Sequence, residues 1–408
     1  MTVLLKHPKI RLWLGVVFFI LLGCLLRKLM PRPYVWVFAF LSWGVALGFL
    51  TAAVRSEAAK SVGLVCATVL LALFLVEGWL SLDAPGDTPH GSLMDVDSVE
   101  QARRDRSDPE LRSFTESVDE DDPILGRRFK AGAVRLLSRG FMQGKEVYNV
   151  VYSTLESGWR VTPQNPDASV AVVFFGCSYT FGMGLEDEEA FPFRVGQALG
   201  PEYQVFNFAF PGYGAHQMLA QIENGFLDPL AARYDCIIPF FLTIEDHKMR
   251  SAGQDWARKG PRYVLENGRL EHRGKVSDIS RYTLGPVKRF FRNCLIYRRF
   301  DDLENPALEE YGELHVAILA RSAQLLAERY RTRLTVLLWP EAGFGPGLKR
   351  AGVRFVDLNA LMPDWDEHKE RYTIQNDEHP NAATARLLSD FLVDSIKRTA
   401  DETPCLTR

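Results

Sequence analysis

Short apolar runs alternate with amphipathic helical stretches over the last two-thirds of the chain, and this rhythm constrains the fold more than any other feature. The apolar runs cover residues 170–175, 203–208, 236–242, 334–339 and 353–358. The helical stretches cover residues 190–199, 216–227, 308–329 and 382–399. Nearly continuous apolar strands that alternate with helices are typical of a parallel sheet covered on both faces. The sequence therefore predicts an α/β fold.

One stretch, residues 248–299, breaks this rhythm. It contains QDWARKGPRYVLENGRLEHRG, in which Asn267-Gly268 has the composition of a tight hairpin turn. We expect a β-hairpin insertion here, placed where it can overhang a ligand site.

The N-terminal region has a different composition. Three long apolar runs, residues 12–26, 34–54 and 62–82, approach the length needed to span a bilayer. They predict a three-helix transmembrane anchor over residues 1–82, with buried core helices as the alternative. Cys24 also allows a lipoprotein cleavage box after a signal peptide. The Lys and Arg residues slightly favour a cytoplasmic N-terminus, which would place the rest of the chain outside the cytoplasm.

Charge supports the same division. The first 82 residues carry eight Lys or Arg and two Glu, whereas the whole 408-residue chain has a net charge of −3. The remainder is therefore acidic, which gives no attraction for nucleic acid. Residues 83–123 read as an acidic linker and residues 124–408 as one folded domain. Six cysteines in a chain of this length do not indicate a disulfide scaffold, although one disulfide is compatible with them.

Residues with useful chemistry follow the predicted strands. Ligands bind at the carboxyl ends of strands in open α/β sheets. Ser178 follows the first strand, and Asn207 and the PGYG turn with Gly212 follow the second. Glu245 and Asp246 follow the third, and Asp377 and His379 come just before the last helix.

These residues can form a nucleophilic site. Ser178 needs a base, for which His379 is the best candidate, and Asp377 can orient that base. The backbone N–H groups of Ser178 and Gly212 can bind an oxyanion. Taken singly, a serine after a strand is usually a helix cap and an Asp-x-His-Pro loop is usually a solvated turn. Their joint occurrence in consistent order favours catalysis.

With these residues in place, residues 124–400 resemble the SGNH/GDSL hydrolases, particularly membrane-anchored bacterial members. The resemblance implies a flavodoxin-like parallel sheet. Its four blocks fall on GCSYTFGMG (176–184), NFAFPGYG (207–214), TIED (243–246) and DEHPN (377–381). It implies Ser178 as nucleophile and oxyanion donor, Gly212 as a second donor, and Asp377 with His379 as the acid–base pair. The spacing of that pair is similar to alginate acetylation proteins of the same superfamily.

Three positions depart from the family pattern. Cys177 replaces the family's Asp beside the nucleophile, and Glu245 stands in place of an Asn that serves as an oxyanion ligand. The acid lies two residues before His379, where three is the commoner spacing. His216 and His247 lie in neighbouring loops, and we expect them at the surface rather than as substrate contacts.

The sequence thus predicts a multi-pass protein of the inner membrane with an extracytoplasmic serine esterase or O-acyltransferase domain. Its expected substrate is an acyl ester, acetyl in the simplest case, of an envelope polysaccharide or lipid. No paired metal-ligand spacing surrounds the eight histidines, so neither metal nor cofactor is expected. The departures at Cys177 and Glu245 motivate the alternative of a catalytically inactive glycan-binding or assembly component.

Overall fold

The computed structural model describes most of the chain after residue 118 and part of the N-terminal region. The residues it describes are 40–47, 51, 57–83, 104, 106–107, 112–113, 119–132, 134–142, 145–253, 259–279 and 308–401. The chain divides into two compact units. One consists of residues 1–90 and 282–305, and the other of residues 91–281 and 306–408.

The first unit contains one long apolar helix, α3 (Glu57–Asp83). Its segment Lys60–Glu77 has a mean hydropathy of 2.0, and in the described part of the chain this is the one helix with the length and composition to cross a membrane. Of the other two expected spans, residues 12–26 lie outside the described residues. Residues 40–47 and 51 of the second are described, as helix. The three-helix anchor therefore stays a prediction.

The second unit is built on a five-stranded parallel sheet, as the alternating pattern predicts. The strand order is β12-β11-β8-β6-β7, with neighbouring strands parallel throughout. Numbered along the chain, this is the order 2-1-3-4-5 of flavodoxin-like sheets. The strands are β6 (Val170–Phe175), β7 (Tyr203–Asn207), β8 (Cys236–Thr243), β11 (Thr335–Leu338) and β12 (Arg354–Asp357).

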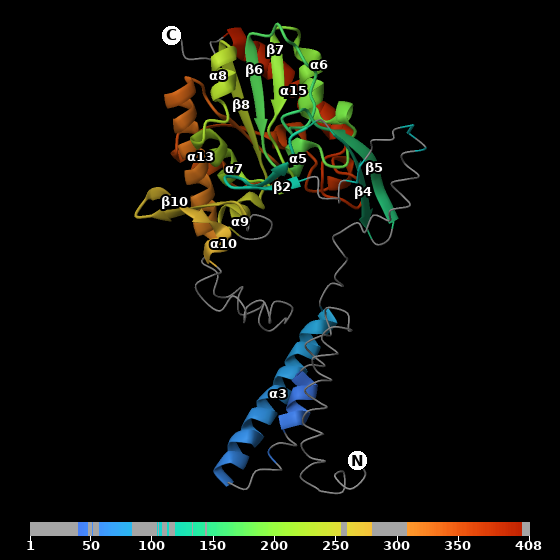
Figure 1. Cartoon of the computed structure of the whole chain (residues 1–408), viewed down its shortest axis with the longest axis vertical. Helices are drawn as coiled ribbons and strands as arrows, with labels where there is room; N and C mark the ends of the chain where they lie inside the picture. Colours follow the sequence, from blue (N-terminus) through green and yellow to red (C-terminus); the bar gives the residue numbers. More distant parts are fainter. Residues whose placement is uncertain are drawn as a thin grey trace. The chain divides into compact units, whose positions relative to one another are not determined.

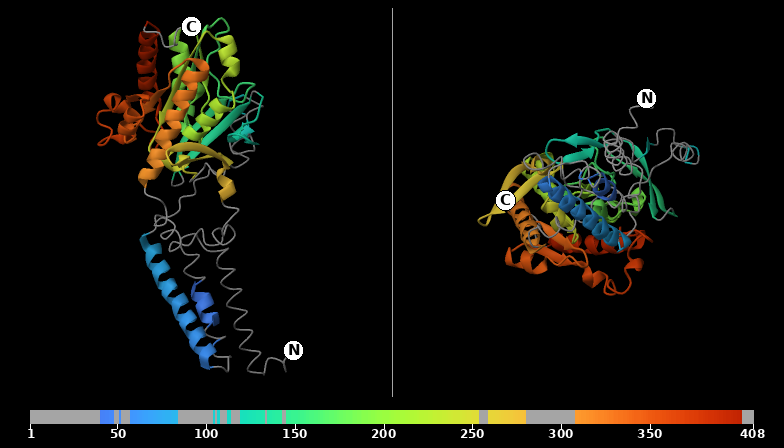
Figure 2. Two further views of the ribbon diagram at one scale, coloured as in Figure 1. Left: turned by 90° about the vertical axis from the view of Figure 1, so that its left-hand side faces the viewer. Right: turned by 90° about the horizontal axis from the view of Figure 1, so that it is seen from below.

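Helices cover both faces of this sheet, as the colours of Figure 1 and Figure 2 show. The interior strand β6 demonstrates why. Ala171, Val173 and Phe175 pack into an apolar cluster shared with α7 (Ala215–Glu223) and α13 (Leu308–Tyr330). The alternate residues Val172 and Phe174 pack into a second cluster shared with α6 (Phe191–Leu199) and α15 (Ala382–Asp401). A strand buried on both sides must be apolar at every position.

Part of the expected acidic linker belongs to the folded unit. Within it, β2 (Asp119–Asp122) pairs antiparallel with β3 (Gly126–Phe129), and β1 (Arg112–Ser113) runs parallel to β4 (Arg135–Met142). The prediction of a solvated spacer is wrong for these residues. Arg127 and Arg128 of β3 form ion pairs with the carboxylates of β2, so the acidic run has a basic partner.

Strand β4 continues through an antiparallel hairpin into β5 (Lys145–Ser153). The buried ring of Tyr152 from β5 contacts the ring of Phe181 with centroids 5.0 Å apart. Phe181 ends the short helix α5 (Ser178–Phe181) that follows β6. The hairpin therefore packs against the turn that carries the candidate nucleophile.

The expected insertion is present as a second hairpin, β9 (Pro261–Glu266) and β10 (Arg269–Lys275). Asn267 and Gly268 both have positive φ at its turn, as the sequence predicts. The hairpin packs against helices α7 and α13. Tyr263 is buried there, and its hydroxyl donates a hydrogen bond to Glu223 at 2.6 Å. The described part of the insertion thus lies on a helical layer of the fold.

Candidate active site

Ser178, His379 and Asp377 form one hydrogen-bonded chain of side chains. The Ser178 Oγ lies 2.8 Å from His379 Nε2, and His379 Nδ1 lies 2.5 Å from Asp377 Oδ1. Ser178 is the first residue of α5, at the edge to which the strands point (Figure 1). This arrangement is that of a serine made nucleophilic by a base, with a carboxylate that fixes the orientation of the base.

Only one residue separates Asp377 from His379, and a tightly curled loop brings their side chains together. The N–H of Asp377 donates to the Ile374 carbonyl at 2.8 Å, and the N–H of Ile374 donates to the His379 carbonyl at 2.9 Å. Asn376 between them has a φ of 61°. The same Asp377 oxygen also accepts the His379 N–H at 2.8 Å. A carboxylate two residues before the histidine therefore reaches the ring because the chain folds back on itself.

The turn that carries Ser178 requires glycine at position 176. Gly176 has a φ of 153°, and a Cβ there would lie 2.2 Å from the Thr180 hydroxyl. The Gly176 carbonyl accepts the Phe210 N–H at 3.3 Å, which joins this turn to the loop after β7. Cys177 is fully buried in the apolar cluster beneath α6 and α15. Its side chain makes no cap hydrogen bond.

Gly212 occupies a turn that also needs glycine. The N–H of Tyr213 donates to the Phe210 carbonyl at 3.0 Å, and Gly212 has a φ of 88°. These features define a type II turn with Pro211 and Gly212 at its centre. Within the described part of the chain, neither the Ser178 N–H nor the Gly212 N–H donates to a backbone acceptor. Both N–H groups therefore meet one requirement of an oxyanion donor.

Asn207, also singled out from the sequence, is buried and supports the turn. Its side-chain oxygen accepts the Ala209 N–H at 3.2 Å. Its amide nitrogen faces the carbonyls of Thr180 and Phe181 at 3.4 and 3.5 Å. The Asn207 amide therefore links the end of β7 to the nucleophile helix.

Glu245 and Asp246 lie on an exposed turn between β8 and α9 (His247–Ser251). Glu245 forms an ion pair with Lys248. The Asp246 side chain is 70% exposed, with Arg250 at 4.0 Å. The structure does not include either carboxylate in the hydrogen-bonded chain of the triad.

The expectation of surface histidines at positions 216 and 247 is wrong. Both are completely buried, together with His315 from α13. The Thr243 hydroxyl lies 3.2 Å from His247 Nδ1 and 2.9 Å from His315 Nε2. Burial lowers the pKa of His216 and His315 to about 3 and also lowers that of His247. These neutral rings form a cluster at the end of β8.

This histidine cluster also contains Arg250, whose Nη1 donates to the Tyr213 carbonyl at 3.0 Å. Arg250 and its neighbours thereby support the loop that presents Gly212. The apolar pattern gives no signal for this cluster, because an amphipathic helix conceals which polar side chains turn inward.

Aromatic rings support the base. The ring of Tyr179 lies 5.4 Å from that of His379 and packs edge-on against Trp339 at 5.1 Å. Burial raises the pKa of Tyr179, and the charges of Cys177 and Glu378 reinforce that shift. Sequence reasoning did not single out this residue, although it is next to Ser178.

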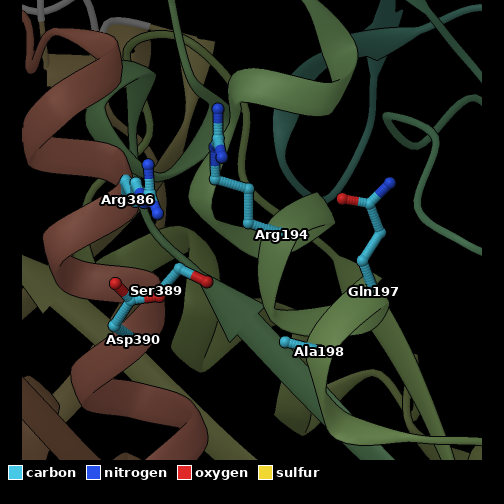
Figure 3. Close-up of a pocket in the computed structure, with 6 residues that line it drawn as sticks. All are labelled: Arg194, Gln197, Ala198, Arg386, Ser389 and Asp390. Carbon is cyan, nitrogen blue, oxygen red and sulfur yellow. The ribbon is translucent and has the colours of Figure 1, made fainter.

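A separate groove lies between α6 and α15, as Figure 3 shows. Its volume is about 450 Å³. None of the triad residues lines it. The lining residues are Arg194, Gln197, Ala198, Arg386, Ser389 and Asp390.

Neither a protein-family model nor a curated protein matches the sequence. Solved structures with a partly similar fold exist. One is a protein described as lipolytic and of the G-D-S-L family from Desulfitobacterium hafniense DCB-2, with 14% identity, a TM-score of 0.29, and coverage of 55% of this chain and 98% of that chain. Another is an alpha/beta hydrolase enzyme from the metagenome of Lake Arreo, Spain, with 13% identity and a TM-score of 0.32. The match covers 56% of this chain and 94% of that chain. Neither likeness is close enough to assign an activity.

Proposed function

We propose that this chain is a membrane-anchored serine ester hydrolase or O-acyltransferase that acts on an acyl ester of an envelope glycan or lipid. The observation that carries the proposal is the continuous chain of hydrogen bonds from Ser178 through His379 to Asp377. A serine aligned in this way has the base and the orienting carboxylate that its hydroxyl needs to attack a carbonyl.

The geometry gives each group a role. His379 Nε2 takes the proton from the Ser178 hydroxyl as its oxygen attacks the ester carbonyl. Asp377 accepts the Nδ1–H and stabilises the imidazolium that forms. The Ser178 and Gly212 N–H groups bind the oxyanion. The imidazolium then protonates the leaving alcohol, and an acyl-serine remains.

The acceptor decides between the two reactions. Water activated by His379 releases the acid, whereas a sugar hydroxyl in the same position accepts the acyl group and completes a transfer. In both cases the acyl–oxygen bond to Ser178 breaks and its hydroxyl regains the proton. The proposed acyl group is acetyl.

One observation supports an extracytoplasmic location for the second unit, and another supports a membrane anchor. Cys236 is disulfide-bonded, and disulfides persist in oxidising compartments. Helix α3 is apolar, and several of its large side chains, including Val62, Leu64 and Leu75, are exposed. Such a surface suits lipid better than water. We extend the proposal to a multi-pass inner-membrane anchor, with the envelope as the source of substrate.

The test uses the full-length protein in detergent micelles with p-nitrophenyl acetate as substrate. The Ser178→Ala variant should lose at least about 10³-fold in kcat/KM, since removal of a triad nucleophile leaves only residual catalysis. The matched control is Ser322→Ala, because the Ser322 hydroxyl is also buried but bonds a helix carbonyl in α13. A fluorophosphonate should label wild type and Ser322→Ala and spare Ser178→Ala. Equal background rates and no labelling of wild type would instead favour the inactive binding component.

A further inference from the structure

The buried arginine Arg160 is the strongest unassigned feature near the site. Its side chain is completely inaccessible to solvent, although arginine is almost never fully buried without partners. It lies between β5 and β6, where its backbone forms bridges with Thr154 and with Asn207. An ionised group in this place must have a compensating set of contacts.

Those contacts are all on the nucleophile side of the fold. Nη1 of Arg160 donates to the carbonyls of Phe181 and Gly182 at 2.5 and 2.7 Å. Nη2 donates to the Leu185 carbonyl at 2.7 Å. Nε donates to the Asp187 carboxylate at 3.1 Å. Four of the five N–H donors of a guanidinium are thus used.

Two rings and a glycine complete the environment of the guanidinium. The ring centroids of Tyr152 and Phe181 lie 4.6 and 4.8 Å from its central carbon, within the range of a cation–π contact. Gly182 has a φ of 88°, and a Cβ there would lie 2.8 Å from Nη1. The chain therefore leaves space for the guanidinium where the helix ends.

The same segment is bonded directly to the nucleophile. The N–H groups of Gly182 and Met183 donate to the Ser178 carbonyl at 3.0 and 2.9 Å. Arg160 fixes the carbonyls of Phe181 and Gly182, and so restrains the peptide units that hold Ser178. The Cys177 side chain provides no cap hydrogen bond on the other side of the turn.

We propose that Arg160 is a positioning residue: it holds the Ser178 turn from its C-terminal side and replaces the restraint that a carboxylate at position 177 would give. The planar guanidinium of Arg160, with N–H donors that point in several directions, is essential to this role. A lysine keeps the charge but has one ammonium that cannot reach carbonyls in several directions at once.

The test compares Arg160→Lys with Arg329→Lys in the full-length protein. Arg329 is a matched control, because it also donates to two carbonyls, those of Ile222 and Glu223, and to a carboxylate, that of Asp228. It does so at the end of α7 rather than at the nucleophile turn. Both variants should melt at a lower temperature than wild type, so kinetics are measured well below both transitions.

The expected kinetics distinguish loss of the Ser178 position from a general loss of stability. Arg160→Lys should lower kcat for p-nitrophenyl acetate by about 10- to 100-fold, because small misplacements of reacting groups have effects of this size. KM should change less than about twofold. Arg329→Lys should keep its kcat. Equal losses of kcat in the two variants, or an unchanged kcat in Arg160→Lys, would overturn the proposal.

A second readout is independent of activity. Cys177 is fully buried beside Ser178, so its alkylation by iodoacetamide, mapped by mass spectrometry, reports opening of the turn. Arg160→Lys should accelerate that alkylation at least about 10-fold, and Arg329→Lys should not. The kinetic readout rests on the proposed function, whereas the labelling does not. Faster labelling in a protein without esterase activity would therefore support Arg160 while refuting the hydrolase.

If Arg160→Lys fails to fold, the same two measurements are made on Asp187→Asn instead. Asp187 bonds the Arg160 Nε and also accepts the Ser153 N–H, so its amide variant weakens the restraint and leaves the guanidinium in place. A fall in kcat of several-fold with faster Cys177 alkylation would support the proposal. Wild-type values for both would contradict it.

Discussion

The two halves of the candidate triad are built in different ways. The turn with Ser178 is buried, and it depends on side chains: Arg160, Asn207 and the packing of Cys177. The loop with Asp377 and His379 is partly exposed, and its conformation comes from its own main-chain hydrogen bonds. The comparison teaches that the candidate nucleophile is held by side chains from several elements, whereas the candidate base is held by a loop that forms its own main-chain hydrogen bonds.

The largest expected effect tests the exposed half. Asp377→Asn should keep the loop, since an amide oxygen can still accept the His379 N–H, but it no longer stabilises the imidazolium. We expect kcat to fall by about 10³- to 10⁴-fold with little change in melting temperature. Steady-state kinetics and calorimetry on the same samples measure the two quantities. A large drop in melting temperature would show that this loop is not independent of its side chains.

An intermediate effect is expected in the buried half. Gly176→Ala places a Cβ against Thr180, and overpacking of this kind costs about 1–3 kcal/mol. The melting temperature should fall by several degrees. Gly352→Ala is the control, because Gly352 also has a positive φ but nothing lies within 4 Å of its Cβ position. If both variants lose the same stability, backbone strain alone accounts for the effect and the close approach to Thr180 is unimportant.

The smallest effect concerns pH and the histidine cluster behind the Gly212 loop. Folding lowers the pKa of His216 and His315 to about 3, whereas an unfolded histidine titrates near 6.5. The unfolded state therefore binds more protons between these values, and stability decreases as the pH falls below about 6.5. Arg250 is the cation that adds to this effect at His216.

The measurement is the urea midpoint at pH 7.5 and pH 5.0. Wild type should be less stable at pH 5.0, and His216→Leu should depend less on pH because one titrating ring is gone. Two results would mean that these rings are protonated in the folded state. One is a wild-type urea midpoint that rises on acidification, and the other is a His216→Leu midpoint that changes with pH as much as that of wild type.

The sequence predicts the sheet well because strands that are covered on both faces appear as nearly continuous apolar runs. Val170–Phe175 is apolar at every position and is covered on both faces. The Asn-Gly hairpin and the placement of Ser178 and His379 at one edge follow from equally local signals. Local pattern fails where a polar side chain has a partner elsewhere in the fold, whether that partner is near or far along the chain. The acidic run at residues 119–122 was expected in solvent, yet it pairs with arginines a few residues later.

The histidines at positions 216 and 247 were misplaced for the same reason. Whether a polar ring points inward depends on His315 and Thr243, which no local pattern connects to it. Arg160 went unnoticed because its four partners lie 21 to 27 positions further along the chain. Arg160 is thus held by polar contacts distant in sequence, whereas His216 is a buried ring whose nitrogens have no hydrogen-bond partner among the described residues.

The hydrogen bond between Ser178 and His379 joins residues 201 positions apart. During synthesis the serine is complete long before its base exists, so a chain arrested anywhere in between carries an unactivated hydroxyl. The proposed reactivity of Ser178 therefore depends on the C-terminal end of the chain, because the candidate base lies in the loop that precedes α15.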